Sequence, residues 1–344
     1  MKSYKQILFI LIVFLKTDTL FSENNLFNVN NIQLEKKDKT KNNILADQAI
    51  KKGFDKLKTK ILLEEDKGKL SDLNFSSIKQ LVTYYQITNI SDDENTNDFL
   101  NFSITFDKDK IHDLFYSRNI SYSEIFDKEL YILPVFIKED EIYIFNNNFF
   151  YENWNKIYKV DLIDFILPIE NIEIIQNINN YKNNLINLEL SDLFEEYKNK
   201  NIALIFIEDD KKVYIKTSIQ EKIISKSFKL KTENLNTSKI YENIITESKK
   251  ELINLVKSQN LIDIRTPSFL NAKLNLNKNS NLVELNKRIK NIDSIENIYV
   301  QEFNKDYMNL KIKYLGKLDK IINQLKKENI NLQIIKDQWV IRTL

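Results

Sequence analysis

Few residues in this 344-residue chain could carry acid–base or metal chemistry. His112 is the one histidine, in the segment KIHDLF, and the chain has no cysteine. A Ser-His-Asp triad or a histidine metal site would have to be built around His112 alone, without the Cys or further His ligands of a zinc site. We therefore interpret His112 as a surface or half-buried helix residue with at most a mild pH response, and we expect no catalytic residue and no bound metal.

Acidic residues are abundant, and a facing pair of carboxylates is what a glycosidase needs. They occur in four short runs: Glu64-Glu65-Asp66, Asp92-Asp93-Glu94, Glu139-Asp140-Glu141 and Asp209-Asp210. Each run falls in an expected turn, where water solvates the charges, and the segment 91–98 lacks the glycine of an EF-hand loop. The alternative is that acids from distant loops meet in one cleft, which would make the chain a metal-independent hydrolase acting on envelope glycans.

Glycine is too scarce for the common nucleotide-binding loops. Only Gly53, Gly68 and Gly316 occur, and they stand far apart. A P-loop or a dinucleotide-binding fingerprint requires clustered glycines, so we expect neither a nucleotide nor another cofactor. The formal charge of +2 becomes zero if residues 1–22 are removed. Nonspecific nucleic-acid binding needs an excess of Lys and Arg, so nucleic acid is not expected as a partner.

The segment 130–154 combines two strand-like apolar runs with the asparagine and aromatic run NNNFFYENW. Asparagines 146–148 suit the end of a hairpin, after which Phe149, Phe150 and Trp154 can fold back as a hydrophobic lid. The alternative is an exposed surface on which these three aromatic residues bind a peptide, a glycan or a partner protein.

The first 22 residues have the layout of a secretory signal peptide. Lys2 and Lys5 precede the apolar run ILFILIVFL (7–15), and KTDTLFS follows. This run is shorter than a transmembrane helix, which needs about 20 apolar residues. We expect export to the periplasm with cleavage near Ser22. The alternative is an uncleaved segment, which would then be the chain's contact with a membrane.

The remaining sequence predicts a flexible part followed by modules. Residues 23–43 are polar and expected to be flexible, and 44–127 predict an α+β module that begins with an amphipathic helix over 44–63. Residues 128–237 predict a second α/β module with a helix over 190–199, for which Ser191 is the expected N-cap. Its first strand contains Pro134, which cannot donate to a ladder, so the strand should start or bulge there or lie at an edge.

Residues 238–344 predict a long helix followed by a ferredoxin-like module. After the helix come a strand (269–277), a helix (281–291), two strands (295–303 and 307–314), a helix (317–328) and a strand pair (332–335 and 339–343). This order is that of the split βαβ fold. The expected fold class is therefore α+β, in several small modules with antiparallel sheets. A ferredoxin-like fold hosts many unrelated functions and supplies no activity by itself.

Four stretches together resemble a family of exported proteobacterial envelope proteins known as domain of unknown function 2066. They are ADQAIKKGFDKL with the following YYQI and FSITFD, then LYILPVF with NNNFFYENW, then ELSDLFEEYKNKNIALIF, and finally SIENIYVQEF, LKIKYLGKLDKIINQL and WVIRTL. The resemblance runs over almost the whole mature chain. It implies an envelope protein without an assigned reaction.

These features lead us to expect a noncatalytic envelope protein that acts as a binding or assembly scaffold. Its expected partner is another envelope protein, which exposed strand edges could accept as an added strand. The glycan-directed hydrolase is the alternative, and a cleft with two facing carboxylates would favour it.

Overall fold

The computed structural model describes residues 26–35, 42–90, 99–125, 127–139, 141–159, 161–197, 199–209, 211–230, 236–277 and 281–343. The expected signal peptide, the acidic run at 92–94, Asp140 and Asp210 lie outside these residues. The fold class is α+β with several small modules, as the sequence predicts.

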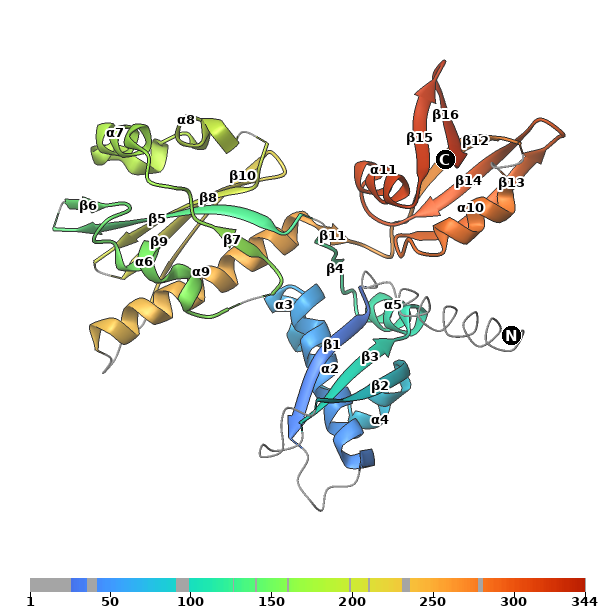
Figure 1. Cartoon of the computed structure of the whole chain (residues 1–344), viewed down its shortest axis with the longest axis horizontal. Helices are drawn as coiled ribbons and strands as arrows, with labels where there is room; N and C mark the ends of the chain where they lie inside the picture. The colour runs from blue at the N-terminus through green and yellow to red at the C-terminus, as the bar shows by residue number, and fades with distance from the viewer. Residues whose placement is uncertain are drawn as a thin grey trace, which may run out of the picture. The chain divides into compact units, whose positions relative to one another are not determined.

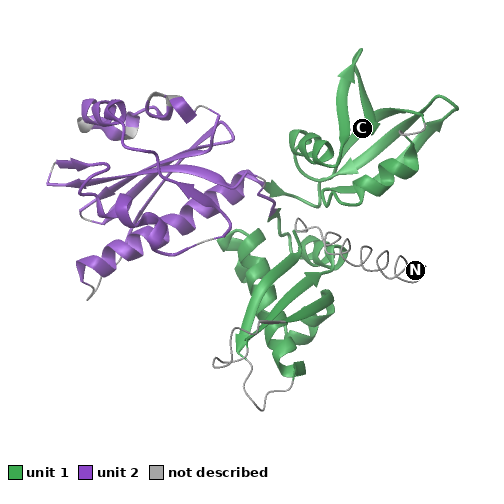
Figure 2. Ribbon diagram, viewed as in Figure 1, with its two compact units in different colours: residues 1–122, 261–344 green, residues 123–260 purple. Residues whose placement is uncertain are grey.

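The elements fall into two compact units, and one of them is discontinuous in sequence. Unit 1 comprises residues 1–122 and 261–344, and unit 2 comprises residues 123–260 (Figure 2). The chain leaves unit 1 within β4 (Tyr122–Ser123) and returns to it at β11 (Leu261–Ile262). The first boundary lies close to the one expected at 127, whereas the second differs from the one expected at 237.

The N-terminal part of unit 1 is a three-stranded antiparallel sheet covered by helices (Figure 1). The sheet contains β1 (Asn28–Glu35), β2 (Val82–Ile90) and β3 (Phe99–Phe106) in the order β1-β3-β2, and its helices are α2 (Asn42–Ile61), α3 (Glu64–Lys67), α4 (Phe75–Gln80) and α5 (Lys108–Ser117). Strand β1 lies within the segment that we expected to be flexible. It is ordered because it pairs with β3 and buries Val29, Ile32 and Leu34.

Helix α2 confirms the amphipathic pattern and packs on β1 and β3 through its apolar stripe. Gly53 lies on the buried face of this helix, where a Cβ atom would come 2.8 Å from Cδ1 of Ile104 and 3.1 Å from Cδ1 of Ile32. The absence of a side chain at Gly53 therefore sets how closely the helix approaches the sheet.

The C-terminal part of unit 1 is a five-stranded sheet with two helices. Its elements are β12 (Ser268–Asn275), α10 (Leu282–Ile289), β13 (Ile295–Phe303), β14 (Tyr307–Tyr314), α11 (Leu318–Lys327), β15 (Ile330–Ile335) and β16 (Gln338–Thr343). The strand order is β13-β14-β12-β16-β15. Strand β14 lies between β12 and β13 and is antiparallel to both, so the first half is the predicted split βαβ unit.

The second half of this sheet departs from the ferredoxin-like pattern. There, the strand after the second helix would lie beside β12, whereas β15 turns back as a hairpin and its partner β16 takes that place. Strand β16 runs parallel to β12, with register pairs only at Lys273–Val340 and Leu274–Ile341 over the described residues.

Unit 2 is a mixed sheet with helices on both faces (Figure 1). Its strands are β5 (Glu129–Lys138), β6 (Glu141–Tyr143), β7 (Asp164–Ile166), β8 (Ile202–Glu208), β9 (Lys212–Ile219) and β10 (Lys222–Lys229), in the order β10-β9-β8-β5-β6 with β7 also paired to β5. Helices α6 (Phe149–Asn153) and α9 (Thr237–Gln259) cover one face, and α7 (Ile172–Asn180) and α8 (Leu190–Leu193) cover the other.

Two sequence expectations need correction in unit 2. The long helix, which we grouped with the C-terminal module, is α9, and it buries Ile244, Leu252 and Val256 in the core of unit 2. The helix expected over 190–199 is instead the single turn α8 followed by a short 3-10 helix, and Glu189, not Ser191, is its N-cap residue. Within the described residues, no helix is both long and apolar enough to cross a membrane.

Candidate functional site

The three aromatic residues singled out from the sequence lie in the core of unit 2. Phe150 and Trp154 are fully buried, and Phe149 is half-buried against the same core. The rings of Phe149 and Phe150 both pack near the ring of Tyr241 on α9, at centroid distances of 5.4 and 5.0 Å. The lid interpretation therefore describes their packing. Phe150 and Trp154 present no exposed face through which a partner could be bound.

The residue that organises this segment is Asn148, which is completely buried. Its Nδ2 group donates to the carbonyl oxygens of Pro134, Tyr143 and Ile144 at 2.9, 3.0 and 2.8 Å. Its Oδ1 atom caps helix α6 by accepting from the backbone N–H of Phe150 at 3.0 Å. One side chain thus joins β5, the end of β6 and the start of α6.

Asn148 also explains the position of Pro134, which we expected at a strand start, a bulge or a sheet edge. Pro134 lies inside β5, opposite Ile205 of β8. On its other side, β5 pairs with β7 at residues 129–131 and with β6 at residues 136–138, so Pro134 falls in the gap between them. A missing N–H is tolerated in this gap, and the Asn148 side chain takes the proline carbonyl.

His112 lies half-buried on α5, in an apolar setting. Its ring stacks on Tyr122 at a centroid distance of 5.4 Å and meets the edge of Phe27 at 5.6 Å. Burial lowers the pKa of His112 to about 4, and the positive charge of Lys108 contributes. The Nε2 atom has no hydrogen-bond partner among the described residues. A neutral imidazole packed between aromatic rings matches the structural interpretation of this residue.

Of the acidic runs, the one at 64–66 forms ion pairs with lysines. Glu64 and Asp66 lie on helix α3, not in a turn, and form ion pairs with Lys67 and Lys69 one turn further along. Glu141 accepts a hydrogen bond from the Tyr143 hydroxyl at 2.5 Å. Over the described ranges, no group of three or more His, Cys, Asp and Glu side chains could hold a metal ion.

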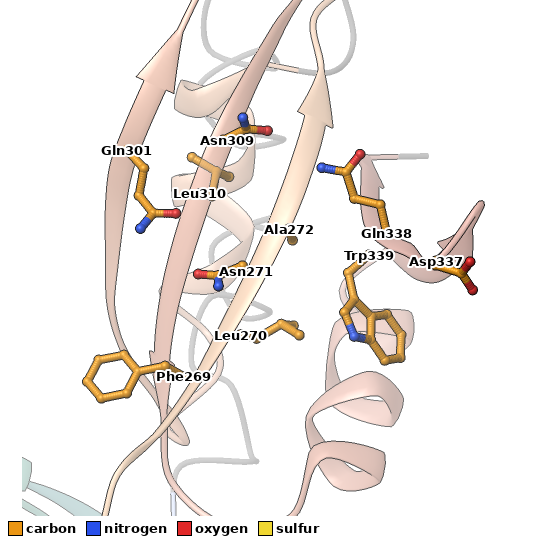
Figure 3. Close-up of a pocket in the computed structure, with 10 residues that line it drawn as sticks. All are labelled: Phe269, Leu270, Asn271, Ala272, Gln301, Asn309, Leu310, Asp337, Gln338 and Trp339. Carbon is orange, nitrogen blue, oxygen red and sulfur yellow. The ribbon is translucent and has the colours of Figure 1, made fainter.

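A groove opens in the C-terminal sheet of unit 1, between β12 and β16 (Figure 3). Its volume is about 520 Å³. Phe269, Leu270, Asn271 and Ala272 of β12 form one wall, and Asp337, Gln338 and Trp339 form the other; Gln301, Asn309 and Leu310 complete the lining. We take this groove as the candidate functional site.

The groove exists because β12 and β16 separate. Their ladder contains only the pairs at Lys273 and Leu274, so residues 268–272 of β12 have no ladder partner on the β16 side within the described chain. On its other side, β12 pairs with β14 along its whole length. Every second residue in the open half of β12 therefore directs its N–H and C=O groups into the groove.

The lining suits binding by hydrogen bonds and by contact with aromatic rings. Asn271, Gln301 and Gln338 supply side-chain amides, each of which can both donate and accept, whereas Nδ2 of Asn309 already donates to Oε2 of Glu302 at 2.6 Å. Phe269 is 50% exposed at one end, with Nζ of Lys311 4.5 Å from the centroid of its ring. Asp337 is the one carboxylate among the lining residues.

The sequence contained part of the signal for this groove. The run FLNAKLNLN predicts a strand by its apolar residues 270, 272, 274 and 276, and residues of both faces of this strand, Phe269 to Ala272, line the groove. Nothing in the pattern, however, indicates that β16 diverges from β12. The divergence follows from the β15–β16 hairpin, which replaces a single strand.

Comparisons of the chain with protein-family models, with curated proteins and with solved structures found no match.

Proposed function

We propose that this chain is a noncatalytic protein exported to the periplasm, where it acts as a binding or assembly scaffold for another envelope protein. The groove between β12 and β16 carries the proposal. Its walls offer backbone groups without a ladder partner, the side-chain amides of Asn271, Gln301 and Gln338, and two aromatic rings, which together suit an extended peptide. Such a peptide would add hydrogen bonds to β12 as a further strand.

Export is supported by the basic start and the apolar run at 7–15. The resemblance to the envelope-protein family, stated above on four stretches, points the same way. The absence of cysteine means that a periplasmic chain of this kind would be stabilised by packing and hydrogen bonds, without disulfides.

The glycan-directed hydrolase receives less support from the site. An inverting or retaining glycosidase needs two carboxyl groups facing each other across the bound sugar, and the groove offers Asp337 alone. Several other carboxylates of the described chain form ion pairs with lysines, as Glu64 and Asp66 do.

The proposal is tested by photo-crosslinking in the envelope of the expressing host. A benzophenone amino acid replaces Asn271 or Gln338 in the groove, and Asp319, exposed on helix α11 of the same module, is the control position. We expect both groove positions, but not the control, to give a covalent adduct with the same envelope protein, identified by mass spectrometry.

Trp339→Ala in the groove should reduce the adduct several-fold while the protein remains folded and exported. Equal adducts from Asp319 and the groove positions, or none from the groove in an exported protein, would refute a peptide-binding groove. Release of reducing sugar from purified peptidoglycan would favour the hydrolase instead.

A further inference from the structure

Strand β2 is the outer strand of the N-terminal sheet of unit 1, and it is exposed on both faces. Residues 83–88 all have exposed side chains, including Tyr84 and Tyr85 at 42% each and Ile87 at 38%. On its inner side, β2 pairs with β3. On its outer side, no described strand pairs with it (Figure 1).

The apolar face of this sheet continues past its helical cover. Tyr85 lies opposite Ile104 and Ile87 lies opposite Phe102, and both partners on β3 are fully buried. Directly opposed residues point to the same face of a sheet, so Tyr85 and Ile87 extend the core face outward onto β2. Helix α2, which contacts β1 and β3, leaves them exposed.

Strand β2 has one register shift, between Val82 and Tyr84 at its start, and from Tyr84 onward it lacks the features that normally protect an edge. Its sequence VTYYQITNI contains no charged residue, no proline and no glycine. Exposed edges are usually protected by lysines, bulges or short length. Strand β10 carries Lys222, Lys226 and Lys229, β1 has a bulge next to Asn31, and β13 has two register shifts. Strand β15 is shorter, at 6 residues, with Ile334 as its large exposed apolar side chain.

We propose that β2 pairs with β2 of a second copy of this chain, in antiparallel orientation, to form a continuous six-stranded sheet. The absence of charged residues from β2 favours a second copy of the chain as the partner strand. When two identical strands pair, any charged side chain on one strand recurs on the other, so a neutral strand avoids repulsion between like charges. The nearest cation on α4, Lys79, is ion-paired with Asp47 at 2.9 Å, so the edge stays neutral beside it.

The register follows from the residues. With a two-fold axis through Gln86, perpendicular to the sheet, Tyr85 of each copy lies opposite Ile87 of the other. This places an aromatic residue against a β-branched one on the core face, a favourable cross-strand pair. This pairing also brings the exposed Tyr85 and Ile87 side chains of the two copies together in one continuous apolar surface. This interface lies on a different sheet from the groove, so it neither requires nor excludes the proposed function.

The first test uses the absence of cysteine from the chain. In Gln86→Cys, the two thiols would face each other across the axis at a separation that allows a disulfide. The purified variant should form a covalent dimer on mild oxidation at low protein concentration. Gln33→Cys, at an exposed position of β1 on the opposite edge, is the matched control and should stay monomeric in denaturing electrophoresis.

The second test uses charge. Gln86→Lys and Gln86→Glu each place like charges against each other at the axis, so each should raise the dimer dissociation constant at least tenfold in sedimentation velocity. Mixing the two variants should restore dimers, and Gln33→Lys should leave the wild-type dimer intact. Circular dichroism checks that each variant is folded. A wild-type protein that is monomeric at all concentrations, or a mixture that fails to restore the dimer, would overturn the proposal.

Discussion

Replacing Asn148 by Ala should destabilise unit 2 far more than the loss of an ordinary surface asparagine. The side chain is completely buried, and its amide group donates to three carbonyl oxygens while its oxygen caps helix α6. Losing an N-cap costs about 1 kcal/mol. The two Nδ2 hydrogens satisfy carbonyl groups whose loss of a partner costs about 1–3 kcal/mol for each buried group. Because at least two carbonyl groups lose their partner, the expected decrease in the free energy of unfolding is about 3 kcal/mol or more.

The assay is urea unfolding followed by tryptophan fluorescence. Trp154 lies in the same core as the segment after Asn148, and a Trp339→Phe background leaves it as the sole tryptophan. Asn171→Ala is the matched control, because Asn171 caps helix α7 through a single bond to the N–H of Glu173 at 2.7 Å. This control should lose about 1 kcal/mol.

Asn148→Asp separates the two roles of the side chain. It keeps an oxygen for the cap and removes both Nδ2 hydrogens, so it should be no more stable than Asn148→Ala. If Asn148→Ala lost no more free energy than Asn171→Ala, or if Asn148→Asp were as stable as the wild type, the reasoning about the buried amide would be refuted.

Two further predictions concern unit 1. Gly53→Ala should lower the stability of unit 1 by about 1–3 kcal/mol, because the new methyl group meets Ile104 and Ile32. Gly68→Ala, with open space around its Cβ, should raise this stability by about 0.5–1 kcal/mol. Thermal unfolding of both variants measures the two changes, and equal effects would contradict the close packing at Gly53. His112 has a pKa of about 4 in the folded protein, below its ordinary 6.5; the charged groups that face it are Lys108, Glu296, Asp109 and Asp113. Between pH 6.5 and pH 4 the unfolded chain therefore binds more protons than the folded one, and the stability falls as the pH drops through this range. Urea unfolding at pH 7 and 4.5 should show a wild-type loss about 2 kcal/mol larger than that of His112→Phe, and parallel losses would show that His112 titrates normally.

The sequence predicted the elements that depend on local periodicity. Helix α2 and strands β3, β12 and β14 occur where the pattern of apolar residues predicts them, because each buries one face. Strand β2 also occurs where the sequence predicts a strand, although the side chains of residues 83–88 are exposed. The sequence also predicts helix α9, but it does not predict that this helix packs on the sheet of unit 2. An apolar stripe shows that a helix is covered, and it does not say which sheet covers it, so α9 was grouped with the strands that follow it in sequence.

Long-range pairing was beyond the reach of periodicity. The asparagines of β1 interrupt its apolar pattern, so the sequence predicts a flexible segment there. The register of this strand is set by its pairing with β3, about 70 residues later in sequence. The sequence predicts Asn148 as a turn residue. Its role as a buried hydrogen-bond donor to strand carbonyl groups that lack a ladder partner cannot be read from a single sequence. The groove was missed for the same reason, because it depends on the divergence of β12 and β16.

The discontinuous composition of unit 1 has a consequence for the order in which the protein folds. Its two parts are joined by contacts of very long sequence separation, such as the bond from the N–H of Leu26 to Oδ2 of Asp293 at 3.3 Å and the packing of Ile262 and Leu315 into the N-terminal core. Unit 2 is continuous and can complete its core as soon as residue 260 has been released. The core of the N-terminal sheet lacks Ile262 and Leu315 until the last 84 residues of the chain arrive. Folding should therefore be slow for unit 1 and rapid for unit 2, so that a chain interrupted after residue 260 would hold one finished unit beside an unfinished one.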